Sequence, residues 1–227
     1  MKLVFDFDDT VFDTERFKEE RFYTSLSEYG VSREEFKSHY QKYRDTNPVY
    51  DIHLHLQELC AEKNIDIPVE DVVFSMVRGI DQYVFPEYKP IFEKYGRENI
   101  FILSQGSEHF QMLKIKHSEI EEKIEKAYIV AENKENTLHD LSLMWPAETI
   151  LFFDNTVSNF HFEWKEANII PVFVGDPSLL SETDSLFLEE NNIRICKKDE
   201  VEANIALFTK EAGIELADEH TREGRVI

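Results

Sequence analysis

Residues 3–10 read Leu3-Val4-Phe5-Asp6-Phe7-Asp8-Asp9-Thr10, an apolar run followed at once by three carboxylates. The apolar part has the composition of a buried parallel strand. Residues two apart in an extended chain point the same way, so Asp6 and Asp8 start on one side. Neighbouring carboxylates need a cation or a shared proton to relieve their repulsion. One can attack and hold a metal ion while the other carries a proton; aspartates that merely cap the next turn are the alternative.

Further short apolar runs recur along the chain, each followed by a stretch of helical length. They are rich in Val, Ile and Phe, as buried parallel strands are. Strands that alternate with helices through right-handed crossovers predict an α/β fold, a Rossmann-like doubly wound parallel sheet. The runs are Ile100–Leu103, Ala127–Val130, Ile150–Phe153, Ile170–Val174 and, as a sixth candidate, Ile193–Cys196.

The segment from about Glu15 to Tyr83 interrupts this alternation with a helical pattern throughout. Ser32-Arg33-Glu34-Glu35 is a capping box. Three apolar stripes at helical spacing follow it, which predict buried helix faces: Phe36, Tyr40 and Tyr43; Ile52, Leu56, Leu59 and Cys60; and Val72, Val73, Met76, Val77 and Ile80. We predict a helical-bundle cap of residues 15–83, a core of residues 1–14 and 84–211, and a weakly ordered tail of residues 212–227.

Polar side chains follow several of the predicted strands, at the sheet edge where α/β proteins bind ligands. Ser104-Gln105-Gly106 offers a hydroxyl and backbone N–H groups to a phosphate. Lys134 can neutralise phosphate charge, and Asp154-Asn155 offers the hard oxygen ligands that magnesium prefers. Singly, Ser104 could be an ordinary N-cap and Lys134 a surface charge. Their joint placement with Asp6 favours one site.

The surroundings of these residues give further expectations. Lys134 opens a predicted helix, Glu135–Leu143, and Thr156 is placed to cap another, Val157–Ala167. Other lysines are poorer phosphate ligands because they fall within a helix or before a strand: Lys114, Lys116, Lys123 and Lys126.

The histidines predict no metal site. His53 and His55 lie two apart on a predicted helix and therefore face different directions. We expect ordinary surface roles for His109 and His117.

Residues from about Met1 to Gly175 resemble the haloacid dehalogenase (HAD) superfamily. Residues 3–11 are similar to its first motif, which implies that Asp6 is the nucleophile and Asp8 the general acid/base. Ser104 resembles the second motif, Lys134 the third, and Asp154-Asn155 the fourth. The resemblance implies Mg²⁺ as cofactor. It implies metal contacts from Asp6, Asp8, Asn155 and Asp154, and phosphate contacts from Thr10, Ser104, Gln105 and Lys134.

Asn155 departs from the pattern of many relatives, which have a second Asp there. An Asp-Asn pair is found in small phosphatases that act on the RNA polymerase carboxy-terminal tail. That likeness implies Asn155 as the direct metal ligand and Asp154 as the partner of Lys134, and the reverse assignment stays open. Phe12-Asp13-Thr14-Glu15, followed by helices, resembles members whose inserted cap closes over the site and helps to choose the substrate.

Composition restricts the partners. The formal net charge of -21 disfavours binding to nucleic-acid backbones and to anionic membranes. Cys60 and Cys196 are far apart and predict reduced thiols in a cytoplasmic protein. The motifs and the family resemblance together imply a magnesium-dependent phosphohydrolase acting on a small phosphate monoester. The alternatives are a phosphomutase or phosphotransferase on the same scaffold, and a non-catalytic module that binds a phosphorylated ligand.

Overall fold

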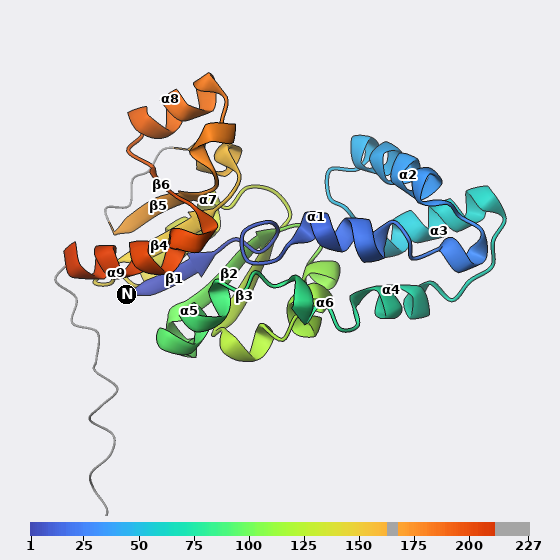
Figure 1. The fold of residues 1–227 in the computed structure, drawn as a ribbon, viewed down its shortest axis with the longest axis horizontal. Coiled ribbons are helices and arrows are strands. Elements are labelled where there is room, and N and C mark those ends of the chain that lie inside the picture. Colours follow the sequence, from blue (N-terminus) through green and yellow to red (C-terminus); the bar gives the residue numbers. More distant parts are fainter. Residues whose placement is uncertain (163–167, 212–227) are drawn as a thin grey trace, which may run out of the picture.

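A six-stranded, wholly parallel sheet forms the centre of the molecule (Figure 1), as the computed structural model shows for residues 1–162 and 168–211. Its strands lie in the order β3-β2-β1-β4-β5-β6. This is the strand order of a Rossmann fold, so the predicted fold class is confirmed. Every predicted run is a strand, with these bounds: β1 Lys2–Phe5, β2 Ile100–Gln105, β3 Lys126–Val130, β4 Ile150–Asp154, β5 Ile169–Val174 and β6 Arg194–Cys196.

Strand β1 is fully enclosed, which explains why its side chains are apolar without alternation. Leu3 and Phe5 pack into the core on one face of the sheet, and Val4 packs into the core on the other. Neighbours β2 and β4 pair with β1 in parallel on its two sides. The carboxyl end of β1, where Asp6 follows, therefore lies at the middle of the binding edge.

Helices cover the sheet on both faces (Figure 1): α5 (Tyr88–Lys94), α6 (Glu108–His117), α7 (Glu135–Met144), α8 (Glu182–Glu190) and α9 (Val201–Glu211). The helix expected from Glu135 is confirmed as α7. No helix within the described residues combines the length and apolar character needed to cross a bilayer. The predicted tail of residues 212–227 lies outside the described residues.

The helix expected at Val157–Ala167 is wrong where the structure describes it. Val157–Phe160 forms a single 3-10 turn, and the backbone is no longer helical at His161. The Thr156 side chain does not cap this turn. The reason is local: Asp154 accepts hydrogen bonds from the Thr156 N–H at 2.8 Å and from the Asn159 side chain at 2.9 Å. These bonds hold the segment against the sheet edge. Residues 163–167 lie outside the described residues.

Between β1 and β2 the chain, described throughout, forms helices and no strand: α1 (Thr14–Phe17), a π-helical turn (Lys18–Phe22), α2 (Arg33–Thr46), α3 (Ile52–Lys63) and α4 (Val69–Val77). We call residues 14–83 the helical insertion. Helix α1 leads away from the sheet, and α2, α3 and α4 lie together beyond it (Figure 1). The capping box at Ser32 is confirmed, and the three stripes are buried apart from Tyr40, which is partly buried. The domain boundaries, and closure of the insertion over a site, remain predictions.

His55 lies at the centre of the insertion, 0% exposed, among aromatic rings. Its Nδ1 is 2.8 Å from the Tyr50 hydroxyl, while its Nε2 has no hydrogen-bond partner. The His39 ring stacks on it with centroids 5.1 Å apart. Burial, with a smaller contribution from His39, lowers the pKa of His55 to about 3. The folded protein therefore holds this imidazole neutral.

Because the folded pKa of His55 is below the unfolded value of 6.5, acid favours the unfolded chain. This residue destabilises the fold progressively as the pH falls from about 6.5 toward 3. The slope is up to ~1.4 kcal/mol per pH unit. We expect His55→Gln, which cannot titrate but can accept from Tyr50, to lose less stability than wild type between pH 7 and pH 5. Urea unfolding at both pH values measures this, and equal losses in the two proteins would refute the assignment.

Candidate active site

The loop after β1 folds tightly back on itself. The Phe7 carbonyl accepts from the backbone N–H groups of Val11 and Phe12, and the Asp9 N–H donates to the Phe12 carbonyl at 2.7 Å. Asp9 has φ +56°, a left-handed conformation that Asp tolerates better than most residues. The Asp6 N–H still donates to the Phe153 carbonyl of β4 at 2.8 Å. Asp6 is thus fixed to the sheet, while the loop turns the next carboxylates toward other elements.

Lys134 joins two carboxylates beneath this loop. Its Nζ lies 2.5 Å from Asp6 Oδ1 and 2.6 Å from Asp154 Oδ2. Lys134 is 2% exposed, Asp154 0% and Asp6 6%. Burial alone would lower the pKa of Lys134, but attraction to the two carboxylates outweighs it and raises that pKa. Burial raises the pKa of Asp6 to about 7, although Lys134 opposes the rise.

Asn155 is connected to Asp6 through a hydroxyl. Thr10 Oγ1 is 3.2 Å from Asp6 Oδ2 and 3.2 Å from Asn155 Oδ1. Asp154, by contrast, uses both carboxylate oxygens on Lys134 and on its own loop. The structure therefore brings Asp6, Thr10, Lys134, Asp154 and Asn155 together, as their positions after strands of one parallel sheet predict.

Asp8 belongs to a second group of contacts. Its Oδ1 is 2.5 Å from Lys114 Nζ and 2.5 Å from Thr14 Oγ1, and its Oδ2 accepts from Gln111 Nε2 at 2.6 Å. Burial would raise the pKa of Asp8, but Lys114 and the hydrogen bonds from Gln111 and Thr14 together lower it. Asp6 and Asp8, which lie two residues apart in the sequence, thus pair with different lysines. Lys114, a poorer candidate from its position within a helix, thus contacts a predicted catalytic residue, and the sequence motifs do not identify Gln111 or Thr14 as partners of that residue.

Gln111 also links Asp8 to the predicted phosphate-binding turn. Its amide nitrogen is 3.0 Å from Ser104 Oγ and 3.0 Å from the Gln105 carbonyl. Ser104 is buried, whereas the Gln105 side chain is exposed. Gly106 has φ +151°, and a Cβ there would lie 3.1 Å from Gln111 Nε2. Glycine at this position therefore allows both the backbone conformation and the close approach of Gln111.

A cleft of about 230 Å³ opens beside Asp8, between the core and the helical insertion. Its lining combines cations with aromatic rings: Asp8, Asp9, Thr14, Phe17, Lys18, Phe22, Tyr40, Arg44, Tyr50, Gln105, Gly106, Ser107, Phe110, Gln111 and Lys114. The deeper residues Asp6, Ser104 and Lys134 are not part of this lining. A ligand in the cleft would therefore lie beside Asp8 and Lys114.

Lys114→Met removes the cation that faces Asp8 while preserving most of the side-chain volume. Since attraction to Lys114 opposes the effect of burial, its loss should raise the pKa of Asp8. Carboxyl ¹³C NMR titration of the metal-free protein measures this pKa directly. We expect the Asp8 midpoint in the variant to move to higher pH than in wild type. An unchanged midpoint would show that Lys114 does not hold Asp8 ionised.

Comparison with known proteins adds evidence on the fold. No family model matches the chain, and no curated protein matches it in sequence. Among solved structures, a HAD-like hydrolase from Burkholderia xenovorans LB400 aligns with TM-score 0.65 and 19% sequence identity. The alignment covers 87% of this chain and 95% of the hydrolase. A protein assigned as β-phosphoglucomutase, from Thermotoga maritima, aligns with TM-score 0.58, 16% identity, and 91% and 99% coverage. An L-2-haloacid dehalogenase aligns with TM-score 0.50, 13% identity, and 92% and 98% coverage.

The chain therefore has the fold of the HAD-like hydrolases, as the resemblance of its motifs predicts. Hydrolases, a mutase and a dehalogenase all have this scaffold, so the fold alone does not define the reaction. The chemistry has to be argued from the side chains at the carboxyl edge of the sheet.

Proposed function

We propose that the protein is a magnesium-dependent phosphohydrolase that cleaves a small phosphate monoester through an aspartyl-phosphate on Asp6. One observation carries this proposal: the buried Lys134 ammonium contacts Asp6 and Asp154 together, and Thr10 joins Asp6 to Asn155. A nucleophilic carboxylate, a cation for phosphate charge and a neutral oxygen ligand thus meet at one edge of the sheet.

The donor set fits a magnesium ion. Within residues 1–162 and 168–211, the carboxylates of Asp6, Asp8 and Asp154 form ion pairs with two ammonium groups, Lys114 and Lys134, so three negative charges face two positive ones and a further cation is favoured. Magnesium favours hard oxygen ligands, usually one or two carboxylates with waters and substrate oxygens. Asp6, the backbone carbonyl of Asp8 and the amide oxygen of Asn155 would hold it, and the ion would offset charge on the phosphoryl oxygens. We assign Asp154 to Lys134, because its oxygens are already engaged.

The chain's own groups then account for both chemical steps. Ser104, whose Oγ accepts from Gln111, can direct its O–H toward a phosphoryl oxygen. An Asp6 oxygen attacks phosphorus in line, an Asp6–phosphorus bond forms, and the bond to the leaving oxygen breaks as Asp8 donates a proton. Asp8 then removes a proton from water, which attacks phosphorus and releases Asp6 and inorganic phosphate. Because the contacts with Lys114, Gln111 and Thr14 favour the ionised form of Asp8, Asp8 must loosen them to act as an acid.

The cleft supports a small substrate. Its volume of about 230 Å³ suits a small phosphorylated molecule, and Lys18, Arg44 and Lys114 supply positive charge to its lining. The net charge of -21 disfavours a nucleic-acid backbone as substrate.

A panel of phosphate monoesters tests the proposal by release of inorganic phosphate. We expect turnover with Mg²⁺, and at least a ~10²-fold loss after thorough EDTA treatment, restored when Mg²⁺ is added back. Turnover that survives chelation would remove the metal from the mechanism.

Two rival functions give different results on the same panel. A phosphomutase would isomerise a sugar phosphate without releasing inorganic phosphate. A non-catalytic module would bind Mg²⁺ and a phosphorylated ligand without turning it over.

A further inference from the structure

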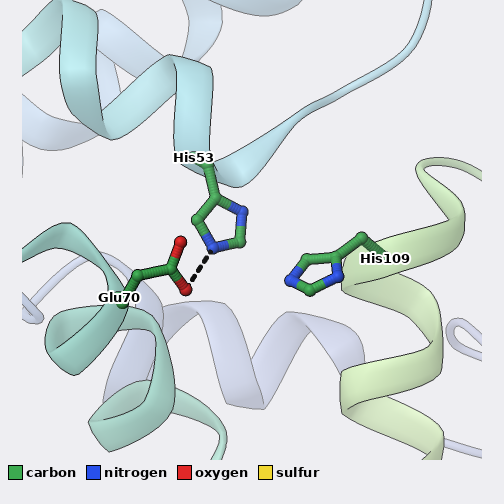
Figure 2. Close-up of side chains that lie close together, drawn as sticks. All are labelled: His53, Glu70 and His109. Carbon is green, nitrogen blue, oxygen red and sulfur yellow. Dashed lines mark hydrogen bonds and ion pairs between the residues drawn. The ribbon is translucent and has the colours of Figure 1, made fainter.

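Three side chains from separate helices converge outside the candidate active site. Figure 2 shows His53 of α3, Glu70 of α4 and His109 of α6 pointing toward one space. Each offers one ligand atom, and these atoms all lie within 4.8 Å of one another. His53 Nε2 is already 3.1 Å from Glu70 Oε2, and the rings of His53 and His109 have centroids 4.8 Å apart.

The spacing of these atoms suits a small divalent cation with imidazole ligands. Two ligands that each bind tetrahedral zinc at about 2.0–2.1 Å lie about 3.3 Å apart. The His53–Glu70 distance already has this value within a few tenths of an ångström. His109 is exposed, so its ring can rotate inward by the remaining distance without disturbing a packed core. Two imidazoles and one carboxylate also form a known zinc donor set, with a fourth position left for water.

Neighbouring contacts hold the three backbones in place. Asp51 caps α3 and accepts from the His53 N–H at 2.9 Å. Phe110, next to His109, contacts the Tyr50 ring with centroids 6.2 Å apart. Phe74 of α4 meets the His117 ring of α6 at 5.4 Å. The insertion and the core are thus already in contact next to the cluster, so metal binding would have to order the ligand side chains and not the helices.

We infer that His53, Glu70 and His109 form a binding site for Zn²⁺ or a similar divalent transition metal that joins the helical insertion to core helix α6. The site is separate from the proposed magnesium site, which uses oxygen ligands only. Imidazole ligands select zinc, nickel, cobalt or copper over magnesium. Phe110 lines the cleft, so a metal on the adjacent His109 would hold one cleft wall, α6, to the helices of the other.

Titration of the full chain with Zn²⁺ and with Co²⁺, in the presence of saturating Mg²⁺, tests the inference. Calorimetry should find one zinc ion bound, and cobalt should give the visible absorption of a tetrahedral site. His53→Gln, Glu70→Gln and His109→Gln should each weaken zinc binding by at least about tenfold. Zinc should raise the Tm of wild type but not that of His109→Gln.

Two controls isolate the site. His161→Gln changes a histidine that follows the Val157–Phe160 turn, outside the three helices that carry the cluster, and should bind zinc as wild type does. Asp6→Asn should also keep this binding step, which separates it from metal bound at the candidate active site. Glu70 and His109 are exposed, so their variants should fold. Absence of zinc binding to wild type, or binding that His53→Gln and His109→Gln leave unchanged, would overturn the inference; the cluster would then be a hydrogen-bonded pair beside a surface histidine.

Discussion

Lys134→Met should lower the free energy of unfolding by about 3–5 kcal/mol. The substitution leaves Asp6 and Asp154 buried side by side without the cation that contacts both. One carboxylate must then bind a proton, because two buried charges of the same sign cannot both persist. Urea unfolding at pH 7 measures the loss. Turnover should also fall, by on the order of 10²–10³-fold, since a positive charge on the phosphoryl oxygens disappears.

Lys116→Met is the matched control, because Lys116 is an exposed lysine on α6. A surface substitution of this kind should change the free energy of unfolding by no more than about 0.5 kcal/mol. A Lys134→Met protein as stable and as active as this control would mean that Lys134 neither balances the buried carboxylates nor handles phosphate charge.

Asp6→Asn should abolish turnover while the protein stays folded. The amide keeps the shape of the side chain but is a poor nucleophile, so kcat should fall by on the order of 10³–10⁶-fold. Stability should change by only about 1–2 kcal/mol. Burial already raises the pKa of Asp6 to about 7, so the fold gains little from its charge. Phosphate release and urea unfolding on the same sample separate the two effects.

Asp13→Asn is the control in the neighbouring turn. Asp13 caps α1 by accepting from the Arg16 N–H at 3.0 Å, and asparagine caps helices equally well. This variant should keep its activity. Near-normal activity in Asp6→Asn would instead remove Asp6 from the reaction.

The strand positions could be predicted from the sequence, because parallel strands buried on both faces are continuous apolar runs. Leu3–Phe5 and Ile150–Phe153 are such runs, and the residues that follow them necessarily meet at one sheet edge. That rule is enough to bring Asp6, Lys134 and Asn155 together. The helix expected after Thr156 failed because the hydrogen bonds made by Asp154 override local helical preference.

The strand pattern does not predict which helical residues reach the site. Gln111 and Lys114 lie three apart on α6 and face the same direction, a spacing that could have drawn attention to them. That α6 presents this face to Asp8 depends on packing. The cluster of His53, Glu70 and His109 is a stronger case, because its ligands come from three helices that must all be placed before the three side chains become neighbours.

Mass spectrometry of a trapped intermediate tests the central claim most directly. Asp8→Asn removes the base for the hydrolysis step, so a phosphate ester with a good leaving group, supplied with Mg²⁺, should leave a phosphoryl group on the chain. We predict that the added mass maps to the peptide containing Asp6 and is absent from the Asp6→Asn, Asp8→Asn double variant. Phosphorylation at another residue, or wild-type phosphate release with no phosphorylation of Asp6 under these trapping conditions, would contradict the account.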